Sequence, residues 1–341
     1  MTRKYLYLFF VLTAVLVTGI LSGCGTQIPP YRLSYEKALS SEDKKEITLK
    51  NFTSDNKEEL HSFKFRPKRI IAVGEAAAET LLRLGQEKYL VAVVDVVENG
   101  AELKERFPGF NKNGKCKILN RPGIETLMML QPDLIVGWAS NFTMKRYGST
   151  DFWSDHGADV YIAASSMPIY RTKNIEMELQ YISDMGHIFG CEAEADTITG
   201  GLRDEIANCK KQLGEKPPRV MVLALSRGLI INYGTGTLPG NIVELSGGRV
   251  ISSDRYLSAE ELINMNPDVI FIVRLDRRLD VGVKMLAHNP KFRTLDCIAQ
   301  GNVHGIPVHW VYNSGINAGN AVKQIVRCLI QAGEAYTSQR L

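Results

Sequence analysis

Short apolar runs alternate with segments of helical periodicity along most of the chain. Arg69–Val73 and Leu90–Val94 have the length and composition of buried strands, and Glu75–Leu84 between them has the pattern of a helix. The same order recurs where a helical segment, Glu125–Leu130, leads into the apolar run Asp133–Gly137. Strands that alternate with helices are typical of a mainly parallel sheet, because parallel strands need a crossover between them. The pattern therefore predicts an α/β protein.

The alternation starts again after Pro217-Pro218. Ser258 followed three residues later by Glu261 forms a capping box, which marks the start of a helix. The segments predicted in this second half are the strands Arg219–Leu225, Ile230–Tyr233 and Asp268–Val273 and the helices Asn241–Leu245 and Ser258–Met265. Near the other end, Ile47–Leu49 and His61–Phe65 flank a polar turn and predict an entry hairpin.

Two segments in corresponding places of the two halves have similar sequences. Glu125–Ile135 reads ETLMMLQPDLI, and Glu260–Ile270 reads EELINMNPDVI. Each is the pattern of a helix that a proline ends, followed by an aspartate and a buried strand. The repeat predicts two lobes of similar, Rossmann-like fold.

A regular helical pattern lies between the halves and runs from Glu192 to Leu213. Gly200-Gly201 in its middle weakens the helix, by about 1 kcal/mol per glycine relative to alanine. The apolar stripe consists of Ala195, Ile198, Leu202, Ile206, Cys209 and Leu213, at spacings of three and four residues. A single helix of this kind would join the lobes as a stiff spine. The predicted divisions are an N-terminal lobe at 46–190, a linking helix at 191–215 and a C-terminal lobe at 216–341.

The N-terminus has the order of charge and apolar residues that an export signal needs. Arg3 and Lys4 precede an uncharged apolar run, which ends in Leu21-Ser22-Gly23-Cys24. That ending resembles a bacterial lipobox, so residues 1–23 are predicted to be a lipoprotein signal peptide and Cys24 to carry the lipid. The polar segment 24–45 would be a tether. An uncleaved signal anchor and cleavage by ordinary signal peptidase are the alternatives.

Composition narrows the class of partner. Of the 41 basic residues, Arg3 and Lys4 fall in the signal segment, which leaves 39 against 37 acidic residues. Proteins that bind nucleic acid usually carry a strong basic excess, so no nucleic-acid partner is expected. The cysteines of the body are scattered without a CxxC pair, which argues against a zinc site or a disulfide framework and leaves one or two disulfides open; they are Cys116, Cys191, Cys209, Cys297 and Cys328.

Several motifs, taken in order, carry a family resemblance. They are Pro67–Val73, Glu79–Leu81 with Leu84-Gly85, Glu125 through Ile135, Glu244–Arg249, Ser258 through Asp268, and Gly301–His304. Together they resemble the siderophore, haem and cobalamin binding proteins of ABC importers, whose two lobes are joined by one long helix. The resemblance covers about residues 60 to 332.

The resemblance implies an exported, lipid-anchored monomer on the outer face of the cytoplasmic membrane. It would capture an iron chelate, a ferric siderophore first, and deliver it to an ABC permease and its ATPase. Haem or a cobalamin-type corrinoid is the alternative ligand. The family's docking glutamates fall on Glu125 and Glu244, each expected at or near a helix start on the rim of its lobe. Otherwise both are ordinary surface glutamates of helices, where an N-terminal position is favourable anyway.

The ligand is expected between the lobes, at the carboxyl ends of the strands. In the first lobe this places Glu75, Trp138, Ser140 and Asn141 at the site. Trp138 matches a position where cobalamin binders also carry tryptophan, or else it caps the lobe core. In the second lobe the candidates are Arg227, Tyr233, Tyr256, Arg274, Trp310 and Tyr312. Arginines there would suit an anionic chelate or propionate groups.

Other functions are weighed against this one. A haem ligand is not evident in the first lobe, where Tyr147 and His156 are candidates only by their proximity in sequence. No G-x-S-x-G, H-E-x-x-H or Walker motif is present, so no catalytic residue is predicted. A receptor for a bare metal ion would need converging histidines and carboxylates, and no metal site is predicted. A signalling or redox lipoprotein of similar fold remains a further alternative.

Overall fold

The structure is a computed structural model that describes residues 40, 43, 45–210, 216–252, 254–274, 278–312 and 315–338. The predicted signal peptide, Cys24 and most of the tether lie outside the described residues, as does Leu213. Among the helices of the described ranges, none is both long and apolar enough to cross a membrane.

The first lobe is built on a five-stranded sheet in the order β5-β4-β3-β6-β7, in which every neighbouring pair is parallel. Its strands are β3 (Ile70–Val73), β4 (Leu90–Val94), β5 (Lys117–Leu119), β6 (Leu134–Gly137) and β7 (Asp159–Ile162). The helices between them are α3 (Glu75–Arg83), α4 (Ala101–Arg106), α5 (Ile124–Met129) and α6 (Thr150–Asp155). All four residues of β3 are buried, which explains why its sequence is continuously apolar. The strands and helices predicted here are confirmed.

The entry hairpin is confirmed as β1 (Ile47–Phe52) paired antiparallel with β2 (Glu58–Phe63). Asn51 attaches it to the edge strand β7. Its side-chain amide donates to the Val160 carbonyl at 2.6 Å, and its side-chain oxygen accepts from the Ile162 N–H at 3.1 Å. One buried asparagine thus satisfies backbone groups at the edge of the sheet.

The second lobe has a six-stranded sheet in the order β11-β9-β8-β12-β13, with β10 also paired to β8. The strands are β8 (Arg219–Ser226), β9 (Leu229–Asn232), β10 (Arg249–Val250), β11 (Tyr256–Leu257), β12 (Val269–Arg274) and β13 (Val303–Pro307). The helices are α9 (Leu238–Leu245), α10 (Ala259–Met265), α11 (Leu279–Ala287), α12 (Asp296–Ala299) and α13 (Val308–Val311). Only β9 runs against its neighbours, since β8 and β9 form a hairpin. The capping box of Ser258 and Glu261 is confirmed at the start of α10.

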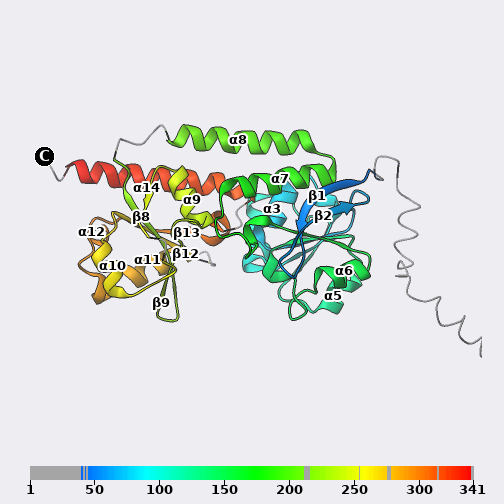
Figure 1. The fold of residues 1–341 in the computed structure, drawn as a ribbon, viewed down its shortest axis with the longest axis horizontal. Coiled ribbons are helices and arrows are strands. Elements are labelled where there is room, and N and C mark those ends of the chain that lie inside the picture. The colour runs from blue at the N-terminus through cyan, green and yellow to red at the C-terminus, as the bar shows by residue number, and fades with distance from the viewer. Residues whose placement is uncertain are drawn as a thin grey trace, which may run out of the picture.

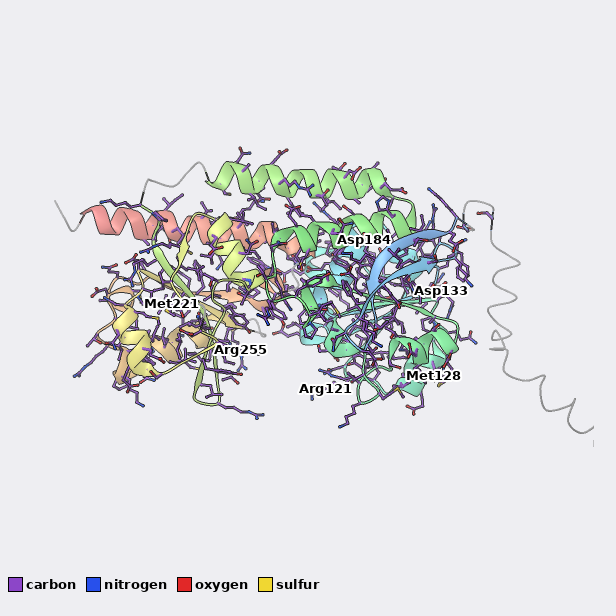
Figure 2. All side chains as sticks on the ribbon, in the orientation of Figure 1. Arg121, Met128, Asp133, Asp184, Met221 and Arg255 are labelled. Atoms are coloured by element: carbon purple, nitrogen blue, oxygen red, sulfur yellow. The ribbon has the colours of Figure 1, made fainter. Side chains whose placement is uncertain are left out.

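The repeat read from the sequence is also a structural repeat. In the first lobe, the Arg69 side chain donates to carbonyls at the end of α5, and its backbone N–H donates to Asp133 at 2.9 Å. In the second lobe, Arg219 does the same with carbonyls at the end of α10 and donates its N–H to Asp268 at 2.7 Å. Asp133 is labelled in Figure 2. The two helix–Pro–Asp–strand units are therefore equivalent residue by residue.

Three long helices lie along one side of the two lobes: α7 (Ile175–Phe189), α8 (Glu192–Lys210) and α14 (Ala318–Ser338) (Figure 1). The chain leaves the first lobe through α8, as predicted for the linking helix. Four positions of its predicted stripe, Ala195, Leu202, Ile206 and Cys209, are buried. The helices α7 and α14, which the sequence interpretation did not assign, pack against α8.

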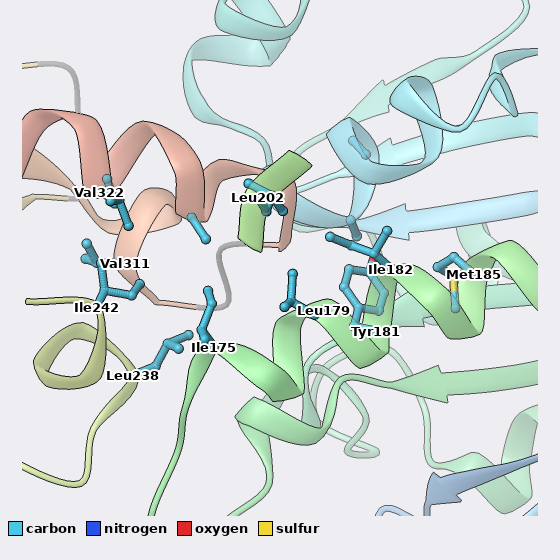
Figure 3. Close-up of a cluster of buried hydrophobic side chains, with 14 of the residues drawn as sticks. Ile175, Leu179, Tyr181, Ile182, Met185, Leu202, Leu238, Ile242, Val311 and Val322 are labelled. Carbon is cyan, nitrogen blue, oxygen red and sulfur yellow. The ribbon is translucent and has the colours of Figure 1, made fainter. Parts of the chain in front are cut away.

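The lobes share one hydrophobic core in addition to their separate ones. Ile175 and Leu179 of α7 lie with Ile242 of α9, Val311 of α13 and Val322 of α14 in one cluster (Figure 3). This cluster contains buried residues of both sheets, whereas two smaller clusters each belong to one lobe. The lobes are therefore held by a continuous interior as well as by the linking helix.

The five cysteines of the described chain are free thiols. Four of them, Cys116, Cys209, Cys297 and Cys328, are buried, and burial raises the pKa of Cys116 and Cys297 to about 12. A thiol with so high a pKa is a small apolar residue rather than a nucleophile.

Candidate ligand-binding site and docking surface

The candidate site is formed where strands end. Parallel strands bring their carboxyl ends to one edge of a sheet. In the first lobe, Glu75 follows β3 and Trp138 follows its neighbour β6. In the second lobe, Arg274 ends β12, while Trp310 and Tyr312 follow the adjacent β13. The predicted residues therefore come from neighbouring strands of each sheet.

An aromatic cluster joins the two lobes at this edge. The Trp138 ring packs edge-to-face on the Tyr312 ring, with centroids 5.3 Å apart, and Tyr312 lies 6.2 Å from Tyr233. All three side chains are half-buried. The buried indole N–H groups of Trp138 and Trp310 have no hydrogen-bond partner among the described residues. Three residues predicted separately thus form one contact between the lobes.

The loop that presents Trp138 is fixed by Asn141. The Asn141 side-chain oxygen accepts the Trp138 backbone N–H at 2.8 Å, and the side chain is buried. The next backbone N–H, of Ala139, donates to the Ser166 hydroxyl at 2.9 Å. Ser140, between them, is exposed. Asn141 therefore orients the tryptophan loop, and Ser140 is the loop residue that faces solvent.

The second lobe contributes arginines and an exposed tyrosine. The Arg255 guanidinium lies 5.7 Å from the ring centre of Tyr256, which is 57% exposed. Arg227 is exposed in the β8–β9 turn, where its φ is +49°. Arg274 is half-buried and lies along α11, since a Cβ added at Gly282 would come within 2.8 Å of its Cδ. Of these arginines, Arg227 and Arg255 have the more accessible side chains.

Glu75 lies inside the junction of the lobes rather than on an open surface. It is the first residue of α3 and only 5% exposed, and its Oε2 accepts the Val97 N–H at 2.9 Å. Burial raises the pKa of Glu75 to about 7, and the nearby carboxylates Glu79 and Glu102 act in the same direction. The group is thus placed to hold a proton near neutral pH.

Further polar side chains link α3 and α4 of the first lobe with the second lobe. Glu79 accepts hydrogen bonds from Arg106 and Asn317, and Arg106 also donates to the Asn317 side-chain oxygen at 2.7 Å. The His309 Nε2 and Glu102 Oε1 atoms lie 3.3 Å apart, with both side chains largely buried. Burial raises the pKa of Glu79, whereas Arg106 opposes the shift. Sequence reasoning missed this polar junction, because its members are far apart in the chain and follow no motif.

The two residues considered as haem ligands are occupied elsewhere. Tyr147 is 1% exposed, and its hydroxyl donates to Asp95, which contributes with burial to a pKa of about 12. His156 lies against Phe152, with ring centres 4.3 Å apart, and its Nδ1 is 2.7 Å from the Phe152 carbonyl oxygen. Neither ring is presented at the aromatic cluster.

The two predicted docking glutamates differ in position. Glu125 is exposed in the first turn of α5, as expected. Glu244 is exposed too, but it lies in the last turn of α9, so the expectation of a helix start is wrong. The reason is that the Thr237 hydroxyl caps the Gly240 N–H, so the helix begins at Leu238, three residues before its predicted start.

The structural repeat pairs Glu125 with another residue, Glu260. Both are in the first turn of the helix that leads to the equivalent strand, β6 or β12, and both are exposed. The repeat extends to the helix ends, where Gln131 and Asn266 share a positive φ of 47° and 38°. The signal for Glu260 was thus present in the internal repeat of the sequence.

Within the described ranges, no group of three or more His, Cys, Asp or Glu side chains is arranged to hold a metal ion.

A model of the periplasmic binding protein family matches residues 70–308, which include both sheets and the linking helix. The chain belongs to this family. Members of the family bind solutes and are not an enzyme class.

The curated relatives of this chain are named for different ligands. The achromobactin-binding periplasmic protein of Dickeya dadantii is 24% identical over 225 residues, 62% of this chain and 66% of that protein. A cobalamin-binding protein of Halobacterium salinarum is 24% identical over 247 residues, 70% of this chain and 62% of that protein. The matches thus span less than two thirds of the length of these relatives.

Solved structures give the same fold. A periplasmic binding protein from Veillonella parvula has a TM-score of 0.73 and 26% identity, and the match covers 83% of this chain and 91% of that one. The protein of an ABC-type Fe³⁺-hydroxamate transport system from Saccharomonospora viridis has a TM-score of 0.69 at 17% identity, covering 83% and 98%. The two-lobe α/β architecture is therefore confirmed.

Proposed function

We propose that this protein captures an iron chelate between its lobes and delivers it to an ABC importer, a permease with its ATPase. The observation that carries the proposal is the aromatic cluster of Trp138, Tyr233 and Tyr312, which brings side chains of both lobes together at the strand ends. Aromatic faces suit the flat, partly apolar surface of a chelate. Membership of the periplasmic binding protein family supports the transport role.

The proposal can be tested by titrating the purified protein with chelates while following tryptophan fluorescence. The panel is a ferric hydroxamate, a ferric catecholate, a ferric carboxylate complex, haem, cobalamin and free metal ions. Trp138 and Trp310 lie at the site, whereas Trp153 is buried in the first-lobe core. We expect saturable quenching by one chelate. Binding, followed through the remaining Trp310, should be strongly weakened in Trp138→Ala and largely kept in Trp138→Phe. A response to free ions alone, or none, would contradict chelate capture.

A corrinoid or haem is the second candidate ligand. The cobalamin-binding relative supports the corrinoid, and a half-buried tryptophan could face its macrocycle. For haem the support is weaker, because Tyr147 and His156 are committed to other contacts. The same titration distinguishes these ligands from ferric siderophores, because only the true ligand should give saturable quenching of the tryptophan fluorescence.

Delivery would use one acidic residue on each lobe, paired with basic residues of the permease. Glu125 serves for the first lobe; for the second we propose Glu244, with Glu260 as the alternative that the structural repeat favours. Charge reversal distinguishes them: Glu125→Lys is combined with Glu244→Lys or with Glu260→Lys, and uptake into cells is measured. The docking pair is the one whose reversal abolishes uptake while chelate binding in vitro is unchanged. Unchanged uptake in both double variants would disprove docking by these residues.

The predicted lipid anchor completes the proposal. Lipid on Cys24 would hold a monomer at the outer face of the cytoplasmic membrane, with residues 24–45 as the tether and lobes at 46–190 and 216–341 around the linking helix 191–215. The test is mass spectrometry of the mature protein. We expect a mass that corresponds to a chain starting at Cys24 and carrying acyl chains. A Cys24→Ser variant should lose its membrane association.

A further inference from the structure

The polar junction between the lobes holds more negative than positive charge. The first lobe contributes three carboxylates, those of Glu75, Glu79 and Glu102, and all three side chains are largely or fully buried. Glu79 and Glu102 both raise the pKa of Glu75, so the three groups lie within electrostatic reach of one another. Within the described part of the chain, the guanidinium paired with them is that of Arg106, on Glu79. Because a buried ionised carboxylate is costly unless it is paired, these carboxylates should hold at least one proton.

Glu75 is the carboxylate that holds this proton. Its Oε2 accepts the Val97 N–H, whereas its Oε1 is buried and receives no hydrogen bond from the described residues. A buried ionised oxygen without a donor costs free energy, and a proton on that oxygen removes the charge. The pKa of about 7 that burial gives to Glu75 agrees with this position of the proton.

The second lobe supplies an imidazole at the same place. His309 of α13 is 7% exposed, and its Nε2 lies 3.3 Å from the Glu102 Oε1. A positive charge on His309 lowers the pKa of both Glu75 and Glu79, so the imidazole lies within electrostatic reach of all three carboxylates. The contact of His309 with Glu102 is an ion pair only while the imidazole holds a proton. The attraction between the lobes at this point therefore weakens when protons are lost.

The remaining part of the junction is η6 (Gly315–Asn317) of the second lobe, which contacts α7 as well as α3. The Gly315 N–H donates to Glu178 of α7, whose side chain is fully buried. Lys173 lies within electrostatic reach of Glu178. Burial raises the pKa of the Tyr181 hydroxyl, which keeps that phenol neutral. The groups near α7 thus add one carboxylate and one lysine, so the excess of negative charge remains.

The same stretch of chain carries a residue of the candidate ligand site. Tyr312 comes three residues after His309 and three before Gly315. Its ring packs on Trp138 of the first lobe, with centroids 5.3 Å apart. The elements that make the proton-dependent contacts, α13 and η6, therefore flank the ring that joins the lobes at the aromatic cluster. Separation at the junction would move Tyr312 away from Trp138.

We infer that the polar junction is a proton-dependent latch between the lobes, which positions Tyr312 beside Trp138 while it holds a proton and loosens when the proton is lost. Where the lobes separate, water reaches Glu75 and the carboxylate ionises like an ordinary glutamate, with a pKa of 4.5 instead of about 7. Docking therefore takes up a proton between these values, and the docked state weakens as pH rises from about 4.5 to about 7. The link to the ligand rests on the proposed function, whereas the latch itself does not.

The latch is tested without a ligand, by amide hydrogen exchange of the purified protein between pH 5 and pH 8, followed by mass spectrometry. The reporters are the Gly315 N–H, which donates to Glu178, and the Tyr312 N–H, which donates to the Val308 carbonyl at 2.7 Å. After correction for the pH dependence of chemical exchange, their protection should fall between about pH 5 and pH 7 and then level off. The fall is at most about tenfold per pH unit for each proton released. Helix α10, which lies away from the first lobe (Figure 1), is the internal reference and should keep its protection.

Variants distinguish the latch from a merely structural contact. Glutamine has the shape of the protonated acid and cannot ionise, so Glu75→Gln should keep at pH 7 most of the protection that the parent has at pH 5. His309→Gln should lose protection at pH 5, because Glu102 loses its cationic partner. Glu46→Gln, which changes an exposed glutamate just before β1, is the matched control and should follow the parent.

Either variant that folds with α10 protected decides the question. Protection that does not change with pH in the parent would overturn the inference and leave chelate capture standing. An equal fall of protection in Glu75→Gln, or a His309→Gln profile equal to that of the parent, would overturn it in the same way.

The link to the ligand is tested by repeating the fluorescence titration with the same panel of chelates at pH 5.5 and pH 7.5. For the chelate that saturates, the affinity of Glu75→Gln relative to the parent should rise at least about threefold between the two pH values. This ratio cancels the pH dependence of the chelate itself. An unchanged ratio would overturn the link to the ligand. Failure of every chelate to bind would overturn the proposed function and this link, while hydrogen exchange would still decide the latch.

Discussion

At the scale of single residues, Glu75 makes stability depend on pH. Its pKa is raised from the ordinary 4.5 to about 7 by burial, so between these values the folded protein holds a proton that the unfolded chain releases. Stability should therefore fall as pH rises from about 4.5 to about 7, by up to ~1.4 kcal/mol per pH unit from this group. Glu75→Gln removes the titrating group and should flatten that slope. Urea unfolding at several pH values measures it.

The matched control for this prediction is Glu46→Gln, which changes an exposed glutamate just before β1. It should leave the pH slope as it is in the parent protein. The outcome that would contradict the assignment is a constant stability difference between the parent and the Glu75→Gln variant across this pH range. The pKa of Glu75 would then be the same in the folded protein as in the unfolded chain.

Residues of the candidate site could be predicted only where they come shortly after a strand in the sequence. Trp138 and Tyr312 each come shortly after an apolar strand, and strand order brings them to one edge. The contact of Asn317 with Glu79 joins residues 238 positions apart, and no periodicity encodes it.

At the scale of elements, the glycine pair in α8 weakens the linking helix without a steric reason. A Cβ added at Gly200 or at Gly201 would meet no atom within 4 Å. Gly200→Ala with Gly201→Ala should therefore stabilise the protein by about 1–2 kcal/mol, since glycine costs ~0.5–1 kcal/mol in a helix interior. Chemical denaturation gives this difference directly.

Gly186 in α7 is the contrasting position. A Cβ there would lie 2.5 Å from the Cβ of Ala195 in α8, so the two helices approach closely through this glycine. Gly186→Ala should destabilise the protein by roughly 1–3 kcal/mol, because the added methyl group overpacks the contact between α7 and α8.

The outcome that would contradict the prediction for α8 is a Gly200→Ala, Gly201→Ala variant that is no more stable than the parent protein. The two glycines would then have a role in bending that helix. Weaker chelate binding by that variant would locate this role in the movement of the lobes.

Elements with strong caps or long periodic patterns were predicted best. The Ser258–Glu261 box fixed the start of α10, whereas the unrecognised cap at Thr237 shifted α9 and with it the interpretation of Glu244. The missed helix α14 has buried residues at helical spacing, Val322, Ile325, Val326 and Leu329. The sequence pattern was therefore sufficient to predict a helix at α14.

At the scale of the whole molecule, the two lobes were predictable because each carries its own copy of the helix–Pro–Asp–strand unit. What joins them was only half predictable. The linking helix follows from its apolar stripe, but the shared core is made by side chains of α7, α9, α13 and α14, which are far apart in the sequence. The polar junction of Glu79, Arg106 and Asn317 adds a second contact between distant segments.

The shared core predicts that the protein unfolds as one unit. Leu127 belongs to a core of the first lobe, Leu286 to a core of the second, and Leu179 to the shared one; each is at most 1% exposed. Replacing any of them with alanine should cost about 2–5 kcal/mol. If the lobes are coupled, each substitution should move a single transition that tryptophan fluorescence and far-ultraviolet circular dichroism report at the same denaturant concentration. Independent lobes would instead give two transitions, with Leu127→Ala moving one and Leu286→Ala the other, and Leu179→Ala would then show which lobe holds the shared core.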